Sequence, residues 1–267
     1  MNIIDRGSGI PVVLIPGIQG RWEWMSSAVD ALAENCRVIT FSLGDEPSSG
    51  FSIDPARGVE NFLIQLESVF ERARLSDAVL IGVSYAGPIA TEFAVRHSDR
   101  LRGLMLVSAL PPDWQPDRRA RFYLRAPRLL SPIFFVDAPF RAQREIRAAL
   151  PTLPLRLRFS ARQTATFLRC SISPTRMATR IKWLHEFHFS DPSRVSNPVM
   201  VITGEPGLDR VVPPALTRRY LDCLPHARYA VLPGTGHLGV STKPKEFSAL
   251  VRSFLDELVA HGHRATA

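Results

Sequence analysis

Short apolar runs alternate with amphipathic segments along most of this chain, and this alternation limits the folds open to it. The run 11–17 (PVVLIPG) is almost wholly apolar and precedes a segment with helical periodicity over 22–34. Strands that alternate with helices build a parallel sheet, because each crossover helix returns the chain to the same edge. We therefore predict an α/β fold with a mostly parallel sheet and flanking helices. The predicted strands are 2–5, 11–17, 37–43, 77–82, 101–110, 198–205 and 227–234, and further helices are predicted from Asp54-Pro55, near 214–223 and near 244–260.

The alternation stops in the middle of the chain. Residues 112–195 contain helical pieces broken by proline and no short β run, and the α/β pattern then resumes. A length of 267 residues suits one α/β domain with an insertion. We predict a core of residues 1–111 and 196–267, with 112–195 forming a helical cap. Ligands of such folds bind beyond the carboxyl ends of the strands, which is where we expect the cap.

Basic residues are concentrated in the same insertion. The chain has a formal net charge of +8, whereas residues 112–195 alone hold sixteen basic and six acidic residues. These basic side chains are scattered among Leu, Pro and Phe instead of forming one face with interleaved aromatics, so no nucleic-acid partner is expected. Two interpretations stay open. The arginines either form a solvated face or attract anionic substrates.

Cysteine usage and the N-terminal sequence indicate the cellular compartment to expect. Cys36, Cys170 and Cys223 are far apart, odd in number and without CxxC spacing, which predicts buried, reduced thiols. The first residues lack the basic and apolar regions of a signal peptide. No apolar run approaches the roughly 20 residues that cross a bilayer. We expect a cytoplasmic protein with no membrane span.

The stretch 80–90 (LIGVSYAGPIA) places Ser84 between a predicted strand and a predicted helix. Small residues surround the serine, with Gly82 two positions before it and Gly87 three after. Serine is a favoured helix N-cap, but a serine on a strained strand-to-helix turn is also the arrangement of a hydrolase nucleophile. Local sequence alone leaves both interpretations open.

Two later loops supply partners for a nucleophilic serine. Such a serine needs a base to take its proton and a carboxylate to orient that base. Asp209 follows the predicted strand 198–205, and His237 lies in the glycine-rich loop after the last predicted strand. Both therefore belong at the sheet edge where Ser84 is expected. The chain order Ser, Asp, His favours the nucleophile interpretation of Ser84.

Five stretches resemble the α/β-hydrolase family in its cap-bearing branch with a serine nucleophile. They are VVLIPG, IGVSYAG, LMLVSA, VMVITGEPGLDRVVP and LPGTGHL. The resemblance extends from about residue 10 to 258, with the cap unmatched. The resemblance implies that Ser84 is the nucleophile, Asp209 the orienting acid and His237 the base. Ala86 stands where glycine is commoner in the family, a difference of one methyl group.

The resemblance also implies an oxyanion hole made of backbone N–H groups. One donor would be the amide of Tyr85, and the other that of Ile18, with Gln19 as the alternative. Pro16 replaces the histidine that is usual in the family, which leaves the path of this loop open. For the acid, Asp113 is an alternative to Asp209, because some family members place the acid after the corresponding strand.

No metal or organic cofactor is expected. His185 and His188 flank Glu186 with a spacing that differs from the zinc motif HExxH, so we interpret them as solvated or core histidines. The Gly-Ser-Gly at 7–9 lacks the spacing of a dinucleotide-binding loop.

These observations predict a serine hydrolase that cleaves a carboxylic ester or related acyl bond of a small molecule with an apolar acyl part. A serine in place of an aspartate at position 84 argues against epoxide hydrolase and haloalkane dehalogenase chemistry. Two alternatives remain: carbon–carbon bond hydrolysis or a lyase step on an anionic substrate, and a non-catalytic ligand receptor on the same fold. An arginine-rich cap over an apolar pocket further predicts medium acyl chains and a salt-sensitive preference for esters with a distal carboxylate.

Overall fold

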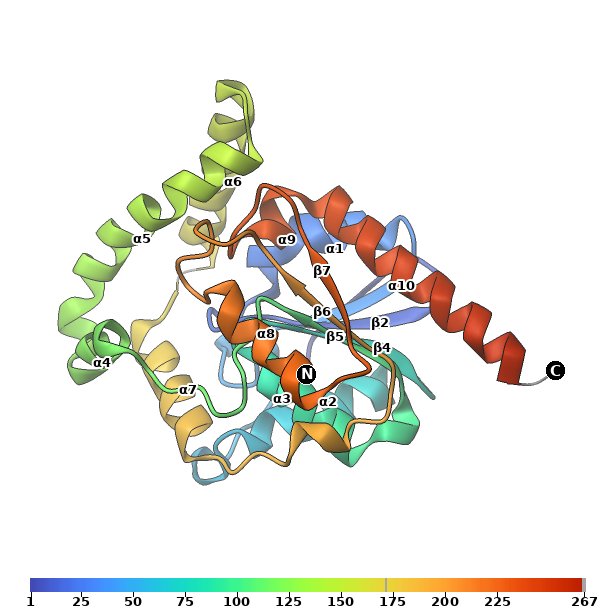
Figure 1. The fold of residues 1–267 in the computed structure, drawn as a ribbon. Helices are drawn as coiled ribbons and strands as arrows, with labels where there is room; N and C mark the ends of the chain where they lie inside the picture. Colours follow the sequence, from blue (N-terminus) through green and yellow to red (C-terminus); the bar gives the residue numbers. More distant parts are fainter. Residues whose placement is uncertain (171, 266–267) are drawn as a thin grey trace.

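A seven-stranded sheet forms the centre of the computed structural model, which describes residues 1–170 and 172–265 (Figure 1). The strand order is β1-β3-β2-β4-β5-β6-β7. Only β1 pairs antiparallel, at the edge next to β3, and the other neighbours are parallel. The predicted α/β fold is confirmed, with each predicted strand present. The strands are β1 (Ile3–Arg6), β2 (Pro11–Ile15), β3 (Arg37–Phe41), β4 (Ala78–Val83), β5 (Leu101–Val107), β6 (Val199–Thr203) and β7 (Arg228–Val231).

Helices cover both faces of the sheet, which explains why central strands such as β2 and β4 carry no polar side chain. Val13 and Ile15 of β2 belong to one buried cluster, and Val12 and Leu14 belong to the other. The side chains alternate in this way because successive residues of a strand point to opposite faces. On one face lie α2 (Glu60–Arg72), α3 (Ala86–Arg96) and α8 (Pro214–Cys223), and on the other lie α1 (Ser26–Ala33), the short α9 (Gly239–Thr242) and α10 (Pro244–Ala265).

Two sequence-based predictions need correction. The segment after Asp54 begins as a 3-10 turn over Pro55–Arg57, and α2 starts only at Glu60, because Gly58 interrupts the helix with a positive φ of 52°. The expectation of buried thiols was wrong for Cys223, which is exposed at the last residue of α8. A helix end presents side chains to solvent even where the preceding turns pack on the sheet.

Four helices are inserted between β5 and β6, and in Figure 1 they stand along one side of the core, in green to yellow. Their contacts place the insertion over loops that follow strands. Arg180 donates to the carbonyl oxygen of Ile18 after β2, and Arg141 to that of Arg210 after β6. Because parallel strands end at one edge, the insertion covers the carboxyl end of the sheet. The helices are α4 (Arg118–Arg125), α5 (Pro127–Ala149), α6 (Leu153–Arg169) and α7 (Pro174–Glu186).

The longest helices, α5 and α10, have 23 and 22 residues. Charged side chains interrupt both, so neither has the continuous apolar stretch of about 20 residues that a bilayer requires. Over residues 1–170 and 172–265, no helix combines the length and apolarity needed to cross a membrane.

Candidate active site

Ser84 lies on a strained turn between β4 and α3. Its φ is +55°, in the left-handed region that residues with a side chain rarely adopt. The backbone holds it there, because the Ser84 N–H donates to the Val107 carbonyl at 2.9 Å and the Ser84 carbonyl accepts from Gly87 and Leu110 at 3.0 Å each. The N-cap residue of α3 is Tyr85, and no side chain caps this helix. The N-cap interpretation of Ser84 therefore does not describe the structure.

Small residues around the serine allow the turn to be this tight. A Cβ on Gly82 would lie 2.8 Å from both the Ala86 carbonyl oxygen and the Ala90 Cβ, closer than packed atoms approach. Gly87 is crowded in the same way by Ala109. Ala86 is fully buried, so the extra methyl group at that position is accommodated.

The structure brings the three candidate catalytic side chains together in one chain of contacts. His237 Nε2 lies 3.0 Å from Ser84 Oγ, and His237 Nδ1 lies 3.1 Å from Asp209 Oδ2. The other carboxylate oxygen, Asp209 Oδ1, accepts the N–H groups of Val211 and Val212 at 2.9 and 2.8 Å. These bonds leave the Asp209 carboxylate fixed on both sides, with its second oxygen aimed at the imidazole.

Burial and charge have opposite effects on the pKa values of Asp209 and His237. Burial disfavours ionisation of Asp209, but the charge of His237 and the hydrogen bonds to the carboxylate hold its pKa below the usual value. Burial likewise opposes protonation of His237, yet Asp209 and the nearby Glu145 raise the pKa of the imidazole above its usual value. The site is therefore built to stabilise an imidazolium beside a carboxylate, the pair that forms when a base takes up a proton.

The loop after β2 runs alongside Ser84. A Cβ on Gly17 would lie 3.5 Å from the Ser84 Cβ, and the Gly20 N–H closes a turn by donating to the Gly17 carbonyl at 2.9 Å. In a trans peptide the N–H points opposite to the carbonyl, so the N–H of Ile18 points out of this turn. Within the described residues, neither this N–H nor that of Tyr85 donates to a protein acceptor. Gln19, the alternative donor, belongs to the same turn.

A buried arginine of the insertion supports this loop, and sequence reasoning missed it. Arg180 of α7 is fully buried; it pairs through two nitrogens with Asp45, contacts Glu46, and donates to the Ile18 carbonyl oxygen at 2.6 Å. The Tyr85 hydroxyl donates back to the Arg180 carbonyl at 3.2 Å. Arg180 is one of sixteen basic residues in the insertion, and nothing in the sequence distinguishes it from those that face solvent.

The other candidates lie away from this site. Asp113 is exposed and forms an ion pair with Arg219, so the structure does not bring it to His237. His185 and His188 are exposed at the end of α7 and just beyond it. In the part of the chain that the structure describes, no three His, Cys, Asp or Glu side chains group as metal ligands.

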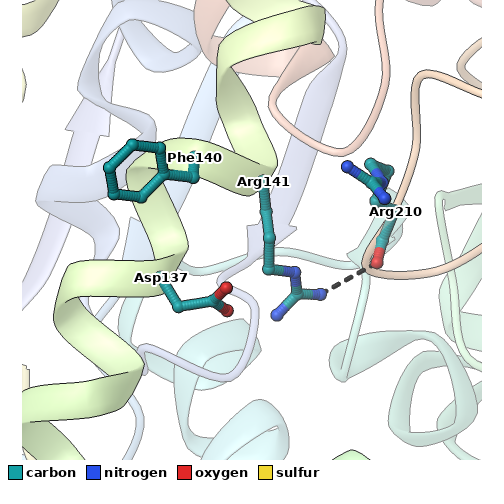
Figure 2. A pocket seen from close by; sticks show the side chains of 4 residues that line it. All are labelled: Asp137, Phe140, Arg141 and Arg210. Carbon is teal, nitrogen blue, oxygen red and sulfur yellow. Dashed lines mark hydrogen bonds between the residues drawn. The ribbon is translucent and has the colours of Figure 1, made fainter.

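A pocket of about 250 Å³ lies between α5 and the loop after β6. Asp137, Phe140, Arg141 and Arg210 line it (Figure 2). Arg141 bridges its walls by donating to the Arg210 carbonyl at 2.8 Å. Arg210 directly follows Asp209, and the positive charge of Arg141 lowers the proton affinity of His237. Charged side chains of both signs therefore line a pocket beside the loop that carries Asp209.

The sequence of residues 12–250 matches the model of the alpha/beta hydrolase family. The chain belongs to this family. Over 244 residues, this alpha/beta hydrolase is 27% identical to a pimeloyl-[acyl-carrier protein] methyl ester esterase of Yersinia enterocolitica, with 86% of each chain covered. It is 31% identical over 116 residues to a 2-hydroxy-6-oxo-2,4-heptadienoate hydrolase of Pseudomonas putida, but this match spans only 41% of each protein. Among solved structures, a bromoperoxidase from Bacillus anthracis superposes with a TM-score of 0.75, at 22% identity and with 95% and 94% of the two chains covered.

Proposed function

We propose that this alpha/beta hydrolase is a serine hydrolase that cleaves carboxylic esters or related acyl bonds. The observation that carries the proposal is the continuous chain from Ser84 Oγ through His237 to Asp209, with contacts of 3.0 and 3.1 Å. A serine hydroxyl in contact with an oriented imidazole is the arrangement that activates a weak nucleophile. The esterase of Yersinia enterocolitica, similar over most of its length, supports acyl-ester chemistry.

The proposed reaction has two halves. His237 Nε2 takes the proton of Ser84 Oγ while that oxygen forms a bond to the ester carbonyl carbon. The carbonyl π electrons move to oxygen, and the N–H groups of Ile18 and Tyr85 stabilise the resulting oxyanion. The oxyanion then collapses, the alcohol leaves with the proton from His237, and an acyl group remains on Ser84. Water attacks this acyl-enzyme by the same route and releases the acid.

Asp209 orients the base and stays ionised throughout. Its bonds to Val211 and Val212 fix the carboxylate, so the imidazole keeps its proton on Nδ1 and presents an unprotonated Nε2 to Ser84. No step in this mechanism requires a metal or an organic cofactor.

Carbon–carbon bond hydrolysis is the second candidate, on two observations. One relative is a 2-hydroxy-6-oxo-2,4-heptadienoate hydrolase, although the match covers less than half of each chain. The pocket between α5 and the Asp209 loop carries Arg141 and Arg210, and guanidinium groups suit an anionic substrate. A non-catalytic receptor is disfavoured by the assembled serine, histidine and aspartate.

Turnover of p-nitrophenyl esters from acetate to palmitate, beside a panel of anionic diketones, tests the proposal. We expect the highest kcat/KM with medium acyl chains and covalent labelling by a fluorophosphonate probe. Ser84→Ala should abolish both, since a nucleophile acting with its base contributes several orders of magnitude in rate. An unchanged melting temperature would show that the variant is folded. Retention of more than about a tenth of the turnover in this variant would place the nucleophile elsewhere. Binding without turnover or labelling would favour a receptor.

A further inference from the structure

Outside the serine, histidine and aspartate, one buried carboxylate faces the catalytic loop. Glu145 lies near the end of α5 and is 2% exposed. Its Oε1 accepts the backbone N–H of Leu238 at 2.6 Å, and its carboxylate also accepts the N–H of Gly236. These two residues flank His237. The insertion therefore holds the peptide groups on both sides of the proposed base.

A second glutamate holds the same loop from the core. The Gly234 N–H donates to Glu205 Oε1 at 2.8 Å, and the Glu205 N–H donates to the Thr235 carbonyl at 2.8 Å. Glu205 belongs to the loop after β6, so it fixes only the beginning of the histidine loop. The segment that carries His237 itself depends on Glu145, whose helix belongs to the insertion.

The charges around Glu145 also connect it to the base. Burial raises the pKa of Glu145 to about 7, and the charge of Asp209 acts in the same direction. Its hydrogen bonds with Gly236 and Leu238 and the charge of His237 oppose the increase. In return, ionised Glu145 raises the pKa of His237, whereas Arg141, one turn earlier on α5, lowers it.

We propose that Glu145 is a positioning residue that holds His237 against Ser84, so that docking of the insertion and geometry of the base are coupled. The carboxylate does not touch the reacting atoms. It acts by accepting the two N–H groups beside the histidine and by adding a second negative charge next to the imidazole. Without it, those N–H groups lose their acceptor, and the loop must move toward water to satisfy them. The inference rests on the proposed hydrolase function, which it extends to the insertion.

Two substitutions separate the acceptor from the charge. Glu145→Gln keeps an oxygen that can accept from Leu238 but removes the charge, and Glu145→Ala removes both. Glu186→Gln, an exposed carboxylate at the end of α7, is the matched control. The kcat/KM of a p-nitrophenyl ester is measured from pH 5 to 9 for each protein, beside its melting temperature.

In the glutamine variant, we expect turnover at the high-pH plateau within about twofold of the unsubstituted enzyme. The acidic limb should move to lower pH by up to about half a pH unit, because Glu145 is itself partly protonated near pH 7. In the alanine variant, plateau turnover should fall by about tenfold or more, because two N–H groups lose their partner. The control should change neither quantity. If the alanine variant does not fold, the position of the acidic limb in the glutamine variant decides whether Glu145 acts on His237.

Titration of the His237 imidazole by NMR makes the result independent of turnover. Loss of the Glu145 charge should lower the pKa of His237 in Glu145→Gln and leave it unchanged in Glu186→Gln. An imidazole pKa and an acidic limb that both stay in place in Glu145→Gln would overturn the inference, as would full plateau turnover in Glu145→Ala. If no ester is turned over by the unsubstituted protein, the proposed reaction fails, and the NMR titration still decides whether Glu145 acts on His237.

Discussion

The guanidinium of Arg180 donates to the carbonyl oxygen of Ile18 across 2.6 Å, although the two residues are 162 positions apart. Arg180 comes from the insertion, and Ile18 lies in the loop beside the proposed nucleophile. The same guanidinium neutralises Asp45 and Glu46, both nearly fully buried, so the ionic cluster is shielded from water. The insertion is thus tied to the core at the loop that we expect to hold the oxyanion.

Arg180→Met should destabilise the fold substantially. Removing one partner of a buried ionic cluster leaves Asp45 and Glu46 without their counter-charge, which typically costs about 3–5 kcal/mol. Urea unfolding followed by circular dichroism measures the loss. Arg176→Met is the control, because Arg176 is on the same helix and contacts the same Glu46 from a side chain that is 32% exposed. Equal midpoints for the two variants would contradict a structural role of the buried cluster.

Asp209→Asn should cut ester turnover severely, because the imidazole loses the carboxylate that fixes its tautomer. In the best-studied serine hydrolases this change costs about ten-thousandfold in kcat. Asp113→Asn, measured in parallel, should leave turnover nearly unchanged, because Asp113 pairs with Arg219 on the surface. The opposite ranking of the two variants would assign the orienting acid to Asp113.

Ester turnover and conformational stability should respond to pH in opposite directions. Asp209 and Glu145 raise the pKa of His237 above the usual 6.5 or so of an imidazole, and only the neutral imidazole accepts the serine proton. We therefore expect kcat/KM to fall as the pH decreases through that raised pKa. The raised pKa also means that protonation of His237 stabilises the fold. This contribution is complete below about pH 6.5 and is lost as the pH rises through the folded-state pKa. The free energy of unfolding is measured against pH for the unsubstituted protein and for His237→Gln, and the difference between the two isolates this contribution. A stability advantage of the unsubstituted protein that increases with pH would refute the raised pKa of His237.

Esters with a distal carboxylate should be captured faster than neutral isosteres, because Arg141 and Arg210 line a pocket beside the loop that carries Asp209. The advantage in kcat/KM should shrink as the salt concentration rises, since the Debye length falls from about 10 Å at 0.1 M to about 3 Å at 1 M. Arg210→Gln should reduce the advantage of carboxylate-bearing esters at low salt. Arg144→Gln is the control, because Arg144 is an exposed residue of α5. A preference that is absent, or equal at both salt concentrations, would mean that the arginines of the insertion only face solvent.

Much of the fold followed from the sequence, because its determinants are local. A buried parallel strand is a short apolar run, and an amphipathic helix repeats its apolar residues every three or four positions. All seven strands could therefore be placed, with errors of a few residues at their ends. Ser84, Asp209 and His237 were candidates for the same reason, since each follows a predicted strand and parallel strands end at one edge.

The tertiary structure decided what depends on contacts between distant segments. Only the folded chain brings His237 to Asp209 and leaves Asp113 on the surface, although both aspartates follow strands. Glu145 and Arg180 were invisible in the sequence, because a charged residue on a helix carries no local mark of burial. Their partners, Leu238 and Ile18, lie 93 and 162 residues away. Which charged side chains of the insertion are buried is fixed by how the insertion packs on the core, and helical periodicity carries no information about that packing.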